Sequence, residues 1–164
     1  MFISHATRNR LAERVRRLFG GMPRRVQVAA LPWRIGTHGK VEIMLITSRD
    51  TGRWVLPKGW PEGGEQLFES AEREAVEEAG ISGTMSHLEF GRYFYGKVMR
   101  SGMERRCEVL VFPMEVGDIA SEWREKGQRQ RKWFPAAKAA DLVREPDLGE
   151  LIARFGERRH KSAA

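Results

Sequence analysis

Cysteine is almost absent from this sequence, which has one thiol, Cys107, in 164 residues. A single cysteine cannot form an intramolecular disulfide or a cysteine-based zinc site, and such sparing use is typical of a reducing compartment. Cys107 lies in the apolar run CEVLVF, where a buried core thiol is a simpler interpretation than a catalytic nucleophile. The four histidines show no metal-ligand spacing; they stand at positions 5, 38, 87 and 160.

Long apolar runs are also missing. No stretch approaches the roughly 20 apolar residues that a membrane-spanning helix needs, and the start lacks the apolar stretch of a secretory signal. The first residues are instead rich in arginine, somewhat like a mitochondrial presequence. We favour a short basic amphipathic helix or tail at residues 1–24, and we expect a cytoplasmic protein without a membrane partner.

Acidic residues are scarce at both ends of the chain. Residues 1–25 hold seven arginines and one acid, a net charge of +6. Residues 154–164 hold four basic residues and one acid, a net charge of +3. The body, residues 26–153, has 18 basic and 20 acidic residues, a net charge of −2. Because the basicity lies at the ends and forms no stripe along the body, the charge pattern disfavours nucleic acid as a partner.

The sequence contains no internal repeat, low-complexity segment or long linker. Its length suits one domain, and 41% apolar with 31% charged residues permits a packed core. We therefore divide the chain into a basic N-terminal segment (1–24), one folded domain (25–156) and a C-terminal tail (157–164).

Hydrophobic patterns predict the main elements. Strands are expected at residues 25–34, 41–48, 54–57, 88–98, 107–116 and 132–134. Helices are expected at residues 65–79, 135–143 and 147–155. This order predicts an α/β domain in which helices pack on a mixed sheet.

The helix expected at residues 65–79 carries an unusual concentration of acid. Glu74, Glu77 and Glu78 lie within five residues, and like charges three or four positions apart repel by a few tenths of a kcal/mol. At about 100° per residue, these carboxylates border the apolar face instead of lying opposite it. The apolar face comprises Leu67, Phe68, Ala71, Ala75 and Ala79. The cluster is either a solvated acidic face or a site for Mg²⁺ or Mn²⁺, which prefer oxygen ligands.

A glycine-rich loop, KGWPEGGE at residues 58–65, precedes this helix. Its glycines permit sharp turns, so the loop can offer carbonyl oxygens to a cation or N–H groups to a phosphate. Mg²⁺ in proteins usually binds substrate phosphates as well as carboxylates. The loop and the helix together therefore favour a metal-assisted reaction at a phosphate.

The spacing across this loop and helix resembles the Nudix hydrolase box. That box reads Gly, five residues, Glu, seven residues, and then Arg-Glu-aliphatic-x-Glu-Glu-x-Gly-aliphatic. The matching residues are Gly59, Glu65, Arg73, Glu74, Ala75, Glu77, Glu78, Gly80 and Ile81, of which Ala75 is smaller than usual. The resemblance implies a Nudix fold, a curved mixed β-sheet sandwiched between α-helices. It also implies metal-dependent hydrolysis of a diphosphate linkage.

The resemblance also implies roles for single residues. The implied ligands of Mg²⁺, with Mn²⁺ as a substitute, are Glu74, Glu78 and the carbonyl oxygen of Gly59. Glu77 would be a further ligand or the base that activates water. Arg73 would pair with Glu65 and fix the helix.

Outside the box, residues 25–140 resemble the diphosphoinositol polyphosphate phosphohydrolase branch of this family. The resemblance rests on SR-x-x-x-RW-x-x-P before the box and on RxRxWF after it, although Lys58 and Trp60 stand where that branch has glycine. It implies a crowded polyanion as substrate, either a diphosphoinositol polyphosphate or a dinucleoside polyphosphate. Guanidinium groups suit such ligands because they bind phosphate in a bidentate manner. The basic residues expected to bind substrate are Arg25, Arg49, Lys58, Arg106 and Arg129.

Three alternatives stay open. The first is a nucleotide-directed Nudix hydrolase that acts on nucleoside diphosphate derivatives or RNA 5′ triphosphate ends. Aromatic residues would then hold the base, although aromatics in strands also pack into cores; the candidates are Trp33, Trp60, Tyr93 and Tyr95. The second is a non-catalytic binding module, which the four intact box glutamates argue against. The third is nucleic-acid binding through the basic ends, which would depend steeply on salt.

Overall fold

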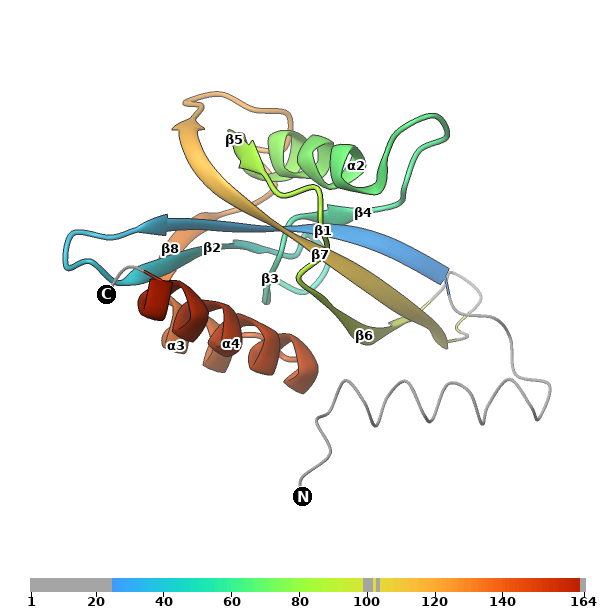
Figure 1. The fold of residues 1–164 in the computed structure, drawn as a ribbon. Coiled ribbons are helices and arrows are strands. Elements are labelled where there is room, and N and C mark those ends of the chain that lie inside the picture. The colour runs from blue at the N-terminus through green and yellow to red at the C-terminus, as the bar shows by residue number, and fades with distance from the viewer. Residues whose placement is uncertain (1–24, 99–101, 103, 163–164) are drawn as a thin grey trace, which may run out of the picture.

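One mixed sheet with helices on both faces makes up the computed structural model (Figure 1). The structure describes residues 25–98, 102 and 104–162, so the predicted N-terminal segment 1–24 lies outside the described residues. The strands are β1 (Arg25–Ile35), β2 (Val41–Thr47), β3 (Trp54–Val55), β4 (Lys58–Gly59), β5 (Ile81–Met85), β6 (Gly91–Val98), β7 (Glu104–Ile119) and β8 (Arg131–Pro135). The helices are α2 (Leu67–Glu74), the π-helical turn η1 (Ala75–Ala79), α3 (Ala136–Leu142) and α4 (Pro146–Ser162).

The long strands β1 and β7 form the centre of the sheet. They run parallel, with Arg25 opposite Cys107 at one end and Trp33 opposite Glu115 at the other. The strand order through them is β3-β2-β1-β7-β5, and β4, β6 and β8 pair with β1, β7 and β2. All of these other pairs are antiparallel. The mixed sheet confirms the predicted fold class.

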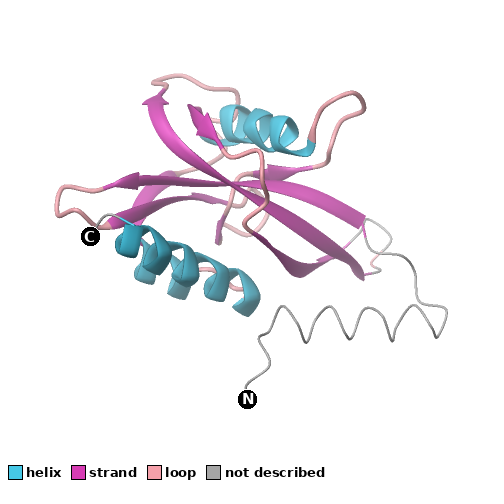
Figure 2. Cartoon of the chain, viewed as in Figure 1, coloured by secondary structure: helices cyan, strands magenta, loops and turns pink. Residues whose placement is uncertain are grey.

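Side chains alternate along β1 between two cores. Val28 and Ala30 face α2 and η1, whereas Ala29, Leu31 and Trp33 face α3 and α4. Figure 2 shows the helices in two groups with the sheet between them. Burial on both faces explains the nearly continuous apolar run in this strand. The predicted sandwich of a sheet between helices is therefore confirmed.

Two short strands depart from the predicted elements. The pattern does not predict β5 because only its first and last residues, Ile81 and Met85, are buried, and a bulge interrupts its pairing with β7. The other strand, β4, lies inside the predicted loop, where two residues pair with β1.

The remaining predictions for this part of the chain concern Cys107 and the C-terminus. Cys107 is buried, which confirms the predicted core thiol. Helix α4 runs on to Ser162, through most of the predicted tail at residues 157–164. Within the described ranges, no helix is both long and apolar enough to cross a membrane.

Candidate active site

Strand β4 brings the glycine-rich loop against the acidic helix, which consists of α2 and η1. Gly59 lies opposite Val28 of β1 and therefore faces the α2 side of the sheet. A Cβ atom placed on Gly59 would lie 2.1 Å from Oε1 of Glu74. The main chain of the loop consequently packs directly on this carboxylate, an approach that only glycine permits.

The acidic helix is less regular than the predicted α-helix at residues 65–79. Gln66 caps its start, where the N–H of Gln66 donates to the Glu69 carboxylate at 2.6 Å. The α-helix then widens into the π-helical turn η1, which ends at Gly80 in a left-handed conformation with φ of 61°. Single π turns of this kind occur frequently at functional sites.

The predicted apolar face of the helix is correct except at Leu67. Ala71, Ala75 and Ala79 are fully buried against the sheet. Leu67, at the edge of the predicted arc, is 40% exposed, because the adjacent Phe68 turns toward the core instead and stacks on His87.

Arg73 joins the helix to the loop before it. Its Nε donates to Glu65 at 3.3 Å, and another guanidinium nitrogen donates to the carbonyl oxygen of Trp60 at 3.2 Å. The predicted pair of Arg73 and Glu65 is therefore present. The hydroxyl of Ser70 also donates to Glu65 at 2.6 Å, and this hydrogen bond is the main cause that lowers the pKa of Glu65.

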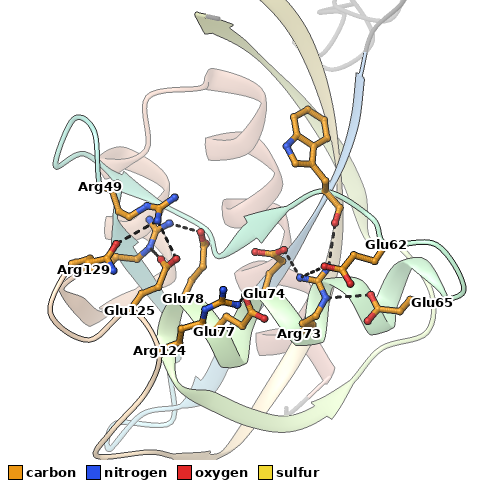
Figure 3. Close-up of polar contacts among 12 residues, drawn as sticks. Arg49, Glu62, Glu65, Arg73, Glu74, Glu77, Glu78, Arg124, Glu125 and Arg129 are labelled. Carbon is orange, nitrogen blue, oxygen red and sulfur yellow. Dashed lines mark hydrogen bonds and ion pairs between the residues drawn. The ribbon is translucent and has the colours of Figure 1, made fainter. Parts of the chain in front are cut away.

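Each of the three clustered glutamates pairs with a different arginine (Figure 3). The pairs are Glu74 with Arg73 at 2.8 Å, Glu77 with Arg124 at 2.8 Å, and Glu78 with Arg129. The carboxylates therefore point to separate cations. In the described part of the chain, no group of three or more His, Cys, Asp and Glu side chains is arranged to hold a metal ion. A shared cation would require these side chains to exchange partners.

Glu78 is the most enclosed of the three carboxylates. The residue is 8% exposed and accepts a hydrogen bond from the main-chain N–H of Lys58 at 3.0 Å. Burial raises the pKa of Glu78, while the Lys58 N–H and the charge of Arg129 oppose this rise. Burial likewise raises the pKa of Glu74, against the effect of Arg73.

Two of the predicted phosphate-binding residues meet beside Glu78, at one end of the row formed by Glu74, Glu77 and Glu78. The Arg129 side chain is 7% exposed; it pairs with Glu78 and Glu125 and donates to the Thr47 carbonyl oxygen at 3.0 Å. Arg49 is 53% exposed and pairs with the same Glu125 at 3.3 Å. Figure 3 shows both guanidinium groups beside Glu125 and Glu78.

The other three predicted basic residues do not join this pair. The Arg25 guanidinium lies 5.5 Å from the ring centre of Trp60, and the Arg106 guanidinium lies 5.3 Å from that of Phe94. Lys58 lies opposite Ala29, so its side chain faces the α3 and α4 side of the sheet, where its ammonium is 5.4 Å from the Tyr95 ring. Burial lowers the pKa of this ammonium.

The sequence interpretation missed the loop between β7 and β8 as a partner of the acidic helix. Arg131, the first residue of β8 after this loop, donates to the carbonyl oxygens of Ala79 and Ala120, both at 2.6 Å, and its guanidinium lies 3.9 Å from the Trp123 ring centre. Arg124 from the same loop pairs with Glu77. The basic and aromatic composition of residues 121–134 was the available signal, but it does not reveal which guanidinium meets which carboxylate.

The fold and the site define an α/β domain that presents a carboxylate-bearing loop and helix at one face of a mixed sheet. The NUDIX domain family matches residues 23–155, most of the chain. The protein belongs to the Nudix family, which confirms the resemblance seen in the box.

Individual relatives agree with this assignment. Nudix hydrolase 21, chloroplastic, from Arabidopsis thaliana is 33% identical over 135 residues, 80% of this chain and 66% of that protein. Diphosphoinositol polyphosphate phosphohydrolase 3-alpha from Mus musculus is 30% identical over 105 residues, 62% of this chain and 60% of that protein. The chain spans 59% to 66% of the length of three of the Arabidopsis thaliana relatives.

Solved structures show the same fold. The crystal structure of an Ap4A hydrolase from C. elegans matches with a TM-score of 0.59 at 20% identity, over 81% of this chain and 96% of that one. The NUDIX domain of Shewanella oneidensis NrtR, complexed with ADP ribose, matches with a TM-score of 0.62 at 16% identity, over 85% and 91% of the two chains.

Proposed function

We propose that the protein is a Mg²⁺-dependent Nudix pyrophosphohydrolase that cleaves a diphosphate linkage in a highly phosphorylated small molecule. Diphosphoinositol polyphosphates and dinucleoside polyphosphates are the proposed substrate classes. The observation that carries the proposal is the row of Glu74, Glu77 and Glu78, which has the guanidinium groups of Arg49 and Arg129 at one end. The similarity to the mouse diphosphoinositol polyphosphate phosphohydrolase supports the first class.

The chemistry of the donor atoms, all oxygens, suits a hard divalent cation that would displace the arginine partners of the carboxylates. Gly59 leaves no space for a side chain against Glu74, so the main chain of the loop lies next to this carboxylate. Glu78 is held beside the loop by the N–H of Lys58. We assign the binding of Mg²⁺, or Mn²⁺, to the Gly59 carbonyl oxygen and the carboxylates of Glu74 and Glu78. When bound, the metal would neutralise phosphate oxygens and lower the pKa of a bound water.

Glu77 is our candidate for a further ligand of the metal or for the base that accepts a proton from the attacking water. Its side chain is 30% exposed, against 12% for Glu74 and 10% for Glu78, so it is the most accessible of the three to solvent. Its ion-pair partner, Arg124, is largely exposed. Arg73, bound to Glu65 and to the Trp60 carbonyl, would keep the loop and the helix in register during the reaction.

The substrate phosphates would lie along the basic residues around the row. Arg49 and Arg129 would bind the phosphates closest to Glu78, and bidentate guanidinium contacts would suit their crowded oxygens. We assign Arg25 and Arg106 to more distant parts of the substrate. The predicted contact of Lys58 is not proposed, because its side chain faces the α3 and α4 side of the sheet.

A nucleotide-directed hydrolase is the second candidate. Of the four aromatic residues that could hold a base, Trp33 and Tyr93 are buried in the core. Trp60 and Tyr95 are partly exposed, and each has a cationic side chain over its ring. This pairing of a ring with a positive charge would suit a nucleobase next to a phosphate.

A screen of the purified protein with Mg²⁺, in which the hydrolysis products are separated by anion-exchange chromatography, distinguishes the two candidates. The panel comprises an inositol pyrophosphate, diadenosine penta- and hexaphosphate, nucleoside triphosphates, a nucleotide sugar and triphosphorylated RNA. Turnover of the first three compounds alone is the expected result. Preference for nucleotides or RNA ends would overturn the substrate class and direct attention to Trp60 and Tyr95.

A further inference from the structure

Arg124 differs from the other two arginines that pair with the clustered glutamates. The Arg129 side chain is 7% exposed and that of Arg73 is 21% exposed, and each has several acceptors. The Arg124 side chain is 71% exposed, and among the described residues it pairs with Glu77 alone, at 2.8 Å. Exposed single ion pairs of this kind are weak. Arg124 is therefore the guanidinium that can leave its carboxylate most easily.

The main chain around Arg124 is nevertheless fixed to the acidic helix. On one side, Trp123 packs against Gly80, where an added Cβ atom would lie 2.7 Å from the Cβ of Trp123. On the other side, the N–H of Glu125 donates to the Glu77 carbonyl oxygen at 3.3 Å. The side chain of Arg124 can thus turn in solvent while its Cα stays beside Glu77, without any movement of the loop.

Arg124 also shares its end of the row with other cations. Figure 3 shows Arg124, Arg129 and Arg49 around Glu77, Glu78 and Glu125, with Arg73 at the opposite end. A divalent cation that takes Glu77 as a further ligand would compete with Arg124 for this carboxylate. It would also bring a phosphate, a strong guanidinium acceptor, to the same place.

We propose that Arg124 is a substrate-binding residue that exchanges partners. It pairs with Glu77 when the site holds neither metal nor substrate, and it binds a phosphate of the polyanionic substrate when metal occupies the carboxylates. This role rests on the proposed function of the site. It predicts opposite effects of one substitution, tighter binding of metal and weaker binding of substrate.

The test compares Arg124→Ala with the unmodified protein in two measurements. Titration with Mn²⁺ alone, followed by electron paramagnetic resonance of the free ion, should show affinity increased by about twofold to fivefold, because a weak competitor for Glu77 is removed. The KM for diadenosine hexaphosphate should rise by about threefold to tenfold, because a charge-assisted contact is lost. Lys126→Ala is the matched control; it removes an exposed cation two residues away that pairs with Glu122, and it should change neither value.

The outcomes distinguish this role from the function on which it rests. If the unmodified protein binds Mn²⁺ but Arg124→Ala binds it equally or more weakly, Arg124 does not compete for Glu77 and the exchange is overturned. An unchanged KM would overturn the phosphate contact in the same way. If the unmodified protein binds no Mn²⁺, the proposed function fails and this role fails with it.

Discussion

Gly59 shows how one contact can determine a residue type. A methyl group at this position would lie 2.1 Å from the Glu74 carboxylate, so Gly59→Ala must displace either the loop or the glutamate. We expect turnover to fall by roughly 10–100-fold, the usual effect of misplacing a metal-site group. Gly63→Ala is the control, since nothing lies within 4 Å of that position. Equal activity of both variants in a phosphate-release assay would remove Gly59 from the site.

Glu78→Gln tests a proposed metal ligand. Turnover should fall by roughly 100-fold or more, since even groups behind metal ligands contribute 10–100-fold. The structure buries Glu78 against Arg129, so urea unfolding should also show a loss of about 1–3 kcal/mol. The control, Glu122→Gln, neutralises a carboxylate whose side chain is 81% exposed. Near-normal turnover of Glu78→Gln would exclude it as a ligand.

Spacing alone identified the residues of the box but not their partners. The positions of Gly59, Glu74, Glu77 and Glu78 follow from local sequence, because one loop and one helix carry them all. Arg124 and Arg129 come from a loop some 50 residues further along the chain, and they reach the helix only through tertiary packing. Sequence patterns do not reveal contacts between residues so far apart in the chain, so the pairing of Arg124 with Glu77 was not predicted.

The stability of the acidic helix depends on the conformation of the residue that ends it, Gly80. Gly80 has a φ of 61° and packs on Trp123, whereas Gly39 has a φ of 70° with nothing within 4 Å. Gly39→Ala should therefore lose only the backbone preference, about 1–2 kcal/mol of unfolding free energy. Gly80→Ala should lose at least about 1 kcal/mol more, because its methyl group meets Trp123. Equal losses in thermal or urea unfolding would show that Trp123 does not constrain this end.

The elements that were predicted well are those with one dominant pattern. Strands β1 and β2 are buried nearly throughout, and the helix core of Ala71, Ala75 and Ala79 follows a regular period. The failures are elements that depend on their neighbours. Strand β5 has three exposed residues and a bulge. The turn η1 is π-helical where an α-helix was predicted, although Ala75 and Ala79 within it are buried as expected.

The distribution of charge over the domain determines how it would meet a polyanion. The basic ends dominate the net charge of +7, but the proposed site uses only a few arginines of a body that is slightly acidic. Specific contacts should consequently matter more than total charge. Arg49→Ala should raise the KM for diadenosine hexaphosphate by about threefold to tenfold and the KM for nucleoside diphosphates less, because it removes a remote phosphate contact.

The control for Arg49→Ala is a substitution that removes the same charge elsewhere. Arg34 lies on β1 and pairs with Glu42 at 2.7 Å, so Arg34→Ala changes the net charge equally without touching the site. It should leave both KM values unchanged. Equal effects of the two variants, or of Arg49→Ala on both substrates, would show that general electrostatic attraction explains binding.

The central claim is that the clustered carboxylates use a divalent metal to cleave a diphosphate. The most direct test strips the unmodified protein with EDTA and adds Mg²⁺ back. Anion-exchange chromatography then follows the loss of phosphate from an inositol pyrophosphate and the cleavage of diadenosine hexaphosphate into two nucleotide fragments. We predict no turnover in EDTA and saturable recovery with Mg²⁺ for at least one of the two compounds. Turnover that is equal with and without metal, or absent for both compounds at every Mg²⁺ concentration, would contradict the claim.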